Sequence, residues 1–185
     1  MSDDFDGDDE LKFIRSILNY EPDTGVFTWN KRTPDMFSSK NPSRICSVWN
    51  ARLSGKKAGK ISGPGYVYIT VLNKNILAHR LAWFYVNGFW PRKNIDHKNL
   101  NKLDNRIDNL REATHSQNMI NVPRPKNNTS GFKGVSFSKR HKSWCACITI
   151  NYRKHHLGYF KDPEDAHAAY AAAASKHHGE FSRAA

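Results

Sequence analysis

The sequence predicts an α+β protein made of two modules. Its 185 residues are enough for one ordinary domain or two small ones. A polar segment with two prolines, residues 121–130, predicts a linker. After it, three strand-like runs and one helical run predict a βββα unit. We therefore expect an acidic disordered tail at residues 1–10, a first module at residues 11–120 and a second module at residues 131–185.

The N-terminal part begins with charge of one sign. The first ten positions contain six of the 17 acidic residues and no Lys or Arg. Asp8 or Asp9 can cap the amphipathic helix that follows. The apolar residues of this helix are Leu11, Ile14, Ile17 and Leu18. A turn at residues 22–25, followed by a short strand, comes next.

The central part of the first module predicts a loop, a hairpin and a helix. Residues 32–60 combine Ser, Gly and Pro with Lys and Arg, which is typical of a loop that can follow a phosphate backbone. Residues 66–78 alternate as two strands around an Asn-Lys-Asn turn. A helix then begins near His79, with apolar residues at core spacing. His79 and Arg80 lie at its positive end, where they can contact phosphate or a catalytic site, and a purely structural role fits equally well.

The second module carries local signals for four elements. Its three predicted strands are residues 131–137, 143–150 and 154–160. Asp162 and Pro163 then start a helix with acidic residues in its first turn. Alanines along one face let this helix pack closely on the sheet, and Gly179 ends it. Because the module has its own start, stop and apolar pattern, we expect it to fold independently.

Composition limits the class of protein. The net charge of +12 suits a polyanionic partner, although solubility alone explains such an excess equally well. The N-terminus lacks the basic and apolar segments of a signal peptide, and no apolar run approaches the thickness of a bilayer. We expect a soluble, cytoplasmic protein without a membrane partner.

Cysteine and histidine spacing argues against structural zinc. Cys46, Cys145 and Cys147 form no CxxC pair and leave an odd thiol in any disulfide scheme, which indicates a reduced compartment. The adjacent histidines at 155–156 and 177–178 diverge in a strand or a helix, so we expect no zinc site there either.

The most informative stretch begins at Asp96-His97 and reaches Asn118. Hydrolysis of a phosphodiester needs a base for water, and a histidine near neutral pH suits that role, so His97 is the candidate general base. Asp96 and Asn118 offer one carboxylate and one amide oxygen for a hard cation, Mg²⁺ or Mn²⁺.

This Asp-His pair sets a condition on the backbone. Neighbours on a regular strand point to opposite faces, so the strand must end or bulge at the pair. The Asn-rich loop that follows can hold such geometry, and we assign Asn105 and Asn109 this scaffolding role in the catalytic site. Thr114 or His115 then opens a short helix that carries Asn118 back toward the pair.

Residues 79–121 resemble the HNH endonucleases, and most closely the homing endonucleases of phages and introns. The resemblance is carried by His79-Arg80-Leu81-Ala82-Trp83, Asn94-Ile95-Asp96-His97 and Asp104-Asn105-Arg106-Ile107-Asp108-Asn109-Leu110. It implies a ββα-metal (His-Me finger) fold and metal-dependent cleavage of double-stranded DNA. Asn118 replaces the third histidine of the strict motif, and His115 is an alternative ligand. The candidate DNA contacts in this module are His79, Arg80, Arg111 and His115.

The second module resembles the DNA-binding domain of plant ethylene-response factors (ERF, Apetala-type). The likeness is carried by Gly131-Phe132-Lys133-Gly134-Val135, Trp144-Cys145-Ala146, His156-Leu157-Gly158-Tyr159-Phe160 and Glu164-Asp165-Ala166-His167-Ala168-Ala169-Tyr170. It implies a three-stranded sheet lying in the major groove. Serines or lysines replace several arginines that read guanine in that family, which implies weak base specificity. The candidate contacts are Lys133, Lys139, Arg140, Lys142, Trp144, Arg153 and Lys154. Trp144 is alternatively a core aromatic.

Together the two resemblances predict a homing-type endonuclease of the phage-infected or bacterial host cytosol, whose first module cuts DNA and whose second module anchors it. Two alternatives stay open. One is a DNA-binding regulator with an inactive nuclease-like centre, and the other is a phage packaging or defence nuclease with low specificity. A monomer and a dimer assembled on DNA are both compatible with the sequence.

Overall fold

The computed structural model describes residues 7–122 and 127–182. The chain divides into two compact units, Met1–Glu112 and Ala113–Ala185. The boundary lies before the predicted linker at 121–130, because the Lys133 ammonium donates to the carbonyls of Ile120 and Val122 and draws the start of that segment into the second unit. The two linker prolines, Pro123 and Pro125, lie outside the described residues.

The first helix begins earlier than the sequence predicted. Helix α1 spans Gly7–Ile17, so residues 7–10 belong to a helix and not to a disordered tail. The physical reason is Glu10, which is buried and accepts a hydrogen bond at 3.0 Å from the indole nitrogen of Trp90. The remaining tail, residues 1–6, lies outside the described residues.

The polar stretch at residues 32–60 is not the loop that its composition indicated. After the antiparallel pair β1 (Leu18–Glu21) and β2 (Val26–Trp29), it forms η1 (Pro34–Met36), α2 (Pro42–Leu53) and the first residue of β3 (Lys60–Ile61). Helix α2 starts at a proline, and the Asn41 side chain caps it by accepting from the amide of Arg44 at 3.1 Å. The Arg32 guanidinium lies 4.0 Å from the ring centroid of Trp49 and ties the helix to the preceding segment.

The rest of the first unit follows the prediction closely. Strand β4 (Val67–Val71) lies between β3 and β5 (Lys74–Leu77), and α3 (Ala78–Asn87) follows directly. The last two strands, β6 (Asn94–His97) and β7 (Leu110–Ala113), pair with each other across a loop that ends in η2 (Ile107–Asn109). The fully buried centre of the core consists of Ile14, Leu18, Ile69, Leu81 and Phe84.

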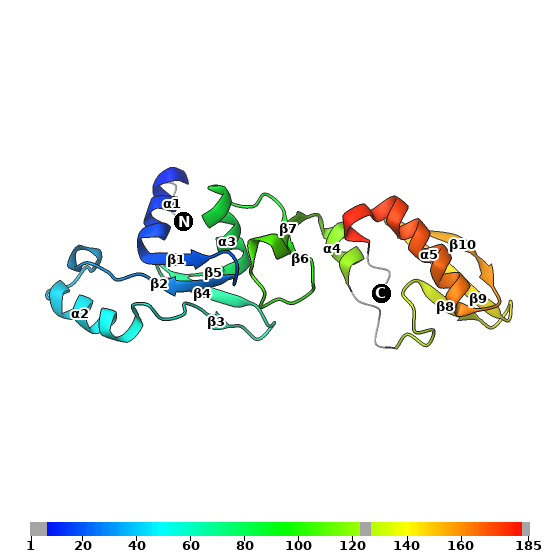
Figure 1. The fold of residues 1–185 in the computed structure, drawn as a ribbon, viewed down its shortest axis with the longest axis horizontal. Helices are drawn as coiled ribbons and strands as arrows, with labels where there is room; N and C mark the ends of the chain where they lie inside the picture. The colour runs from blue at the N-terminus through cyan, green and yellow to red at the C-terminus, as the bar shows by residue number, and fades with distance from the viewer. Residues whose placement is uncertain (1–6, 123–126, 183–185) are drawn as a thin grey trace. The chain divides into compact units, whose positions relative to one another are not determined.

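The second unit has the predicted βββα order after a short helix. Helix α4 (His115–Asn121) opens with a capping box between Thr114 and Gln117. Strands β8 (Val135–Ser138), β9 (Ser143–Ile150) and β10 (Arg153–Phe160) form an antiparallel sheet with β9 in the middle. Helix α5 (Pro163–His178) lies along one face of this sheet and is followed by η3 (Gly179–Phe181) (Figure 1).

The contact between α5 and the sheet assigns the two faces of β9. Ala146 and Ile148 are buried in the clusters that include Ala166, Tyr170 and Ala174 of α5. Since side chains alternate along a strand, Cys145 and Cys147 project from the opposite face, which α5 does not cover. Within residues 7–122 and 127–182, no helix is long and apolar enough to cross a membrane.

Candidate active site

Strand β6 ends at the Asp-His pair, which meets the condition that the sequence set on the backbone. Asp96 and His97 are both buried, at 9% and 5% exposure, so both faces of this end of the strand are covered. A turn follows directly, because the backbone amide of Leu100 donates to the carbonyl of His97 at 2.9 Å.

A hydrogen bond to the amide oxygen of Asn105 selects the tautomer of His97. His97 Nε2 lies 3.3 Å from Asn105 Oδ1, while Asn105 Nδ2 donates to the carbonyl of Leu103. Because this amide oxygen can only accept, Nε2 carries the hydrogen and the proton acceptor of the neutral ring is Nδ1. Burial lowers the pKa of His97 below its usual value of 6.5, and Asn105 partly opposes this shift. A neutral imidazole with Nδ1 as acceptor is the form that a general base needs.

The position of Asn105 is fixed from outside the loop. Its carbonyl accepts a hydrogen bond at 2.8 Å from the buried hydroxyl of Tyr20. Gly25 comes so close to the backbone of Asn105 and Arg106 that a Cβ atom would overlap it, and its φ of +69° also favours glycine. The β1–β2 hairpin thus serves as a support for the loop that orients His97.

Hydrogen bonds from asparagine and aspartate side chains hold together the loop between β6 and β7. Asn109 accepts from the amide of Asn99 at 3.0 Å and donates to the carbonyl of Asp104 at 2.8 Å. Asp104 forms an ion pair with Arg106 at 2.6 Å, which is the main reason that its pKa falls to about 2. These bonds satisfy backbone groups that no regular element pairs, which is the scaffolding role expected of Asn109.

Arg111 occupies a different place from the one predicted. It was expected to contact DNA, but it is buried at 9% exposure and donates to Asp96 Oδ2 from Nε at 3.0 Å and from Nη2 at 2.9 Å. The chain brings this residue to Asp96 because β7, which carries it, pairs with β6. Burying a carboxylate is costly unless it is paired and hydrogen-bonded, and Arg111 supplies both for Asp96.

His79 lies beside His97 and is buried, not on the surface. Its ring is 5.0 Å from the ring of His97, nearly perpendicular to it, and its Nδ1 atom is buried without a hydrogen-bond partner among the described residues. Burial and the neighbouring His97 lower its pKa to about 3. A buried, neutral ring does not fit the predicted phosphate contact. Arg80 is also engaged, because its guanidinium donates to the carbonyls of Pro91 and Lys93.

The sequence reasoning missed two residues that border the pair. The Tyr66 ring lies 5.3 Å from His79 and 6.1 Å from His97, and the Lys102 ammonium lies 4.6 Å from the Tyr66 ring centroid. The positive charge of Lys102 contributes to lowering the pKa of His97. Neither residue has a local signal, since the approach depends on the β3–β4 turn and the Asn-rich loop meeting in space. One contact that joins them is the bond from Lys102 to the carbonyl of Pro64.

The remaining predicted metal ligand, Asn118, belongs to α4 of the second unit. Its side-chain oxygen is buried and has no hydrogen-bond partner among the described residues. Such an oxygen is costly unless a ligand uses it. An amide oxygen is one of the donors that Mg²⁺ or Mn²⁺ accepts, so the chemistry of this side chain fits the predicted role. His115, the alternative ligand, is exposed.

Five of the residues of the second unit that were predicted to contact DNA lie in two groups. Lys139, Arg140 and Lys142 are exposed in the β8–β9 turn, whereas Arg153 and Lys154 are exposed at the start of β10, near the other end of β9.

Two other residues of this unit that were predicted to contact DNA make contacts within the protein instead. Lys133 is committed to the carbonyls near α4. Trp144 packs against the cluster of Val135 and Ala146 on the α5 side, which favours the alternative interpretation as a core aromatic.

Comparisons with known proteins place this site in a family context. Residues 77–120 match the HNH endonuclease family. Protein 3.8 of Escherichia phage T7 is 39% identical over 80 residues, which cover 43% of this chain and 66% of that protein, just under two thirds of its length. No solved structure matches the chain. An HNH endonuclease domain is therefore present at residues 77–120, and the chain has a phage homologue. The findings give no support to an ERF-type domain in the second unit.

Proposed function

We propose that the protein is a metal-dependent DNA endonuclease of the HNH type. The observation that carries the proposal is the hydrogen bond from His97 Nε2 to the amide oxygen of Asn105, which holds a neutral imidazole with Nδ1 as acceptor next to the buried carboxylate of Asp96. These residues lie inside the segment that matches the HNH endonucleases.

In this mechanism, His97 Nδ1 takes a proton from a water molecule that attacks the scissile phosphate. The imidazolium that results keeps its hydrogen bond to Asn105, which is stronger with a charged donor than with a neutral one. Asp96 and Asn118 are the residues that would hold Mg²⁺ or Mn²⁺. When bound, such an ion neutralises charge on the phosphate and on the departing sugar oxygen.

The finer assignment is a homing-type enzyme of the phage-infected bacterial cytosol, with double-stranded DNA as substrate and the second unit as DNA anchor. The net charge of +12 and the exposed basic residues at both ends of β9 support an anchoring role. Because these two groups lie at different ends of the sheet, an anchored duplex has to extend along β9. A monomer and a DNA-assembled dimer both fit this arrangement.

A specific observation also favours a second function, a DNA-binding regulator without nuclease activity. Arg111 already neutralises Asp96 through two hydrogen bonds, and this charge competes with a cation for the same carboxylate. We rank the nuclease first because Asp96, His97 and Asn105 all lie within the segment that matches the HNH endonucleases.

The test is cleavage of supercoiled plasmid DNA with Mg²⁺. The nuclease proposal expects nicked or linear product that EDTA prevents, and a fall in rate of about 10² to 10⁴ for His97→Ala. His155→Ala, at an exposed histidine of the second unit, is the matched control and should cut like the unchanged protein. Intact plasmid combined with tight binding would instead support the regulator, and cleavage in excess EDTA would refute the metal assignment.

A further inference from the structure

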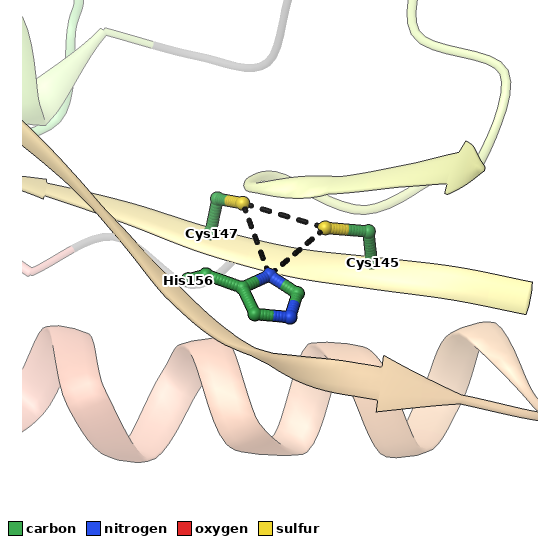
Figure 2. Close-up of side chains that lie close together, drawn as sticks. All are labelled: Cys145, Cys147 and His156. Atoms are coloured by element: carbon green, nitrogen blue, oxygen red, sulfur yellow. Dashed lines mark hydrogen bonds between the residues drawn. The ribbon is translucent and has the colours of Figure 1, made fainter. Parts of the chain in front are cut away.

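Three side chains that the nuclease proposal does not use gather on the second unit, on the face of the sheet opposite α5. Cys145 and Cys147 are two positions apart on β9, and His156 is the register partner of Cys147 on β10. Figure 2 shows both sulfur atoms and the Nδ1 atom of the imidazole turned toward one another. This Cys-Cys-His group is the one set of three metal-ligating side chains found among residues 7–122 and 127–182.

The distances in this group match the edges of a coordination tetrahedron. The two sulfur atoms are 3.4 Å apart, and His156 Nδ1 lies 3.3 Å from Cys145 Sγ and 3.9 Å from Cys147 Sγ. Zinc bonds of about 2.3 Å to sulfur and about 2.0 to 2.1 Å to nitrogen give edges of roughly 3.6 to 3.8 Å at the tetrahedral angle. An ion could therefore be bound with side-chain shifts of a few tenths of an ångström.

A disulfide explains the two cysteines less well. Successive residues of a strand rise by about 3.3 Å, which places Cα atoms two positions apart at the upper limit that a disulfide bridges. A disulfide would also leave His156 without a role, although its Nδ1 faces both sulfur atoms.

We propose that Cys145, Cys147 and His156 form a zinc site with three protein ligands and a fourth position open to solvent. Thiolate and imidazole ligands select a soft or borderline cation such as Zn²⁺ over Mg²⁺, so this site and the oxygen donors of the nuclease centre take different metals. The two cysteines are partly exposed and His156 is exposed, so the group is accessible to an ion from solution.

The place of the site in the sheet indicates what the metal does. The register between β9 and β10 shifts between His156 and Gly158, so the site joins the two strands directly beside an irregularity. Two thiolates balance the charge of Zn²⁺, and a neutral imidazole adds none, so the charge of the basic surface of this unit is unchanged. The metal therefore stabilises the strand pairing and does not strengthen DNA binding through added charge.

The experiment is a cobalt titration of the full-length, reduced protein in excess Mg²⁺, which saturates oxygen sites. Thiolate coordination of Co²⁺ produces an intense near-ultraviolet charge-transfer band that oxygen or histidine ligands do not give. We expect this band to saturate at one equivalent and to disappear when one equivalent of Zn²⁺ is added. It should be lost or strongly reduced in Cys145→Ser, Cys147→Ser and His156→Gln.

Two matched controls and a stability measurement make the result decisive. Cys46→Ser changes a buried thiol that donates to the carbonyl of Arg32, and His155→Gln changes the neighbouring histidine, the register partner of Ile148, which packs toward α5. Both should keep the band. Zn²⁺ should raise the Tm of the unchanged protein and of the controls but not the Tm of His156→Gln. Because His156 is exposed, its replacement should leave the protein folded, so misfolding would not explain the loss of the Tm increase. A folded protein that gives no thiolate band, or a band that His156→Gln leaves intact, overturns the proposal.

Discussion

The hydrogen bond between Asn105 and His97 can be tested by removing its acceptor. Asn105→Ala deletes the side-chain amide but keeps the backbone carbonyl that the Tyr20 hydroxyl contacts. His97 then loses the partner that fixes its tautomer. Since Asn105 raises the pKa of His97 against the effect of burial, its loss should lower that pKa further.

The size of the effect follows from the change in charge during the reaction. In the resting site the bond joins a neutral imidazole to a neutral amide, which contributes about 1 kcal/mol. Once His97 has taken a proton the donor is charged, and the same bond contributes about 1.5 to 3 kcal/mol. The variant therefore loses about 0.5 to 2 kcal/mol more in the transition state than in the ground state, or roughly 2- to 30-fold in rate.

Single-turnover cleavage measured across pH separates this mechanism from simple damage. A base works only when neutral, so activity falls as pH drops through the pKa of His97. Removing Asn105 should lower the plateau rate and move this acid limb to lower pH, whereas Asn105→Asp should move it to higher pH because a carboxylate stabilises the imidazolium. Asn19→Ala, at an exposed asparagine of the same unit, is the control. An acid limb that stays in place in both Asn105 variants would refute the role assigned to this residue.

Three further predictions concern stability. The pKa of His79 is about 3 in the folded protein against 6.5 for an ordinary histidine, so between these values the unfolded chain binds a proton that the folded chain does not. Tm should therefore fall as pH drops from 6.5 toward 3, and His79→Phe should weaken this dependence. An unchanged dependence of Tm on pH would contradict the burial of a neutral ring. Gly25→Ala should lower the free energy of unfolding, measured in urea, by about 1 to 3 kcal/mol. The control is Gly55→Ala, which should lower it less, because Gly55 has a similar φ but open space around it. Equal losses would show that the close approach of Gly25 to the loop is unimportant. Arg111→Ala should lower the free energy of unfolding by about 3 to 5 kcal/mol, because it removes the ion-pair partner of the buried Asp96. Asp96→Asn in the Arg111→Ala background should recover part of this loss. If urea unfolding shows no recovery, the ion pair is not the cause.

The second unit could be predicted from sequence because each of its elements carries its own signal. The Asp162-Pro163 start of α5 and the alternation along β9 are local features, and the observed bounds agree with them closely. Helix α2 was missed for the opposite reason. Its mixed polar sequence has little amphipathic pattern, and part of its stabilisation comes from Arg32 packing on Trp49, a contact that composition does not reveal. The Asn41-Pro42 start was the one local signal present.

The candidate site divides in the same way between local and tertiary information. Asp96, His97 and Asn105 could be proposed from the sequence because their chemistry and order along the chain form a pattern. The burial of His79 and Arg111 could not, since it depends on α3 and β7 meeting β6 in space.

The Cys-Cys-His group escaped prediction for a related reason. The spacing of the cysteines along the chain does not include the histidine, which lies on the neighbouring strand. Only the register between β9 and β10 brings His156 opposite Cys147. Cross-strand sites of this kind become visible once the pairing is known.

The pairing of Asp96 with Arg111 bears on how the proposed metal ligand would be held. Arg111 donates to Asp96 Oδ2 from two nitrogen atoms, and both side chains are about 10% exposed. Such a two-point contact fixes the orientation of the carboxylate. The same arginine repels an incoming cation, so its net effect on metal affinity depends on which contribution is larger. Arg111→Lys keeps the positive charge but removes the two-point contact. If orientation matters more than charge, this variant should need more Mg²⁺ for half-maximal cleavage, and if repulsion dominates it should need no more than the unchanged protein.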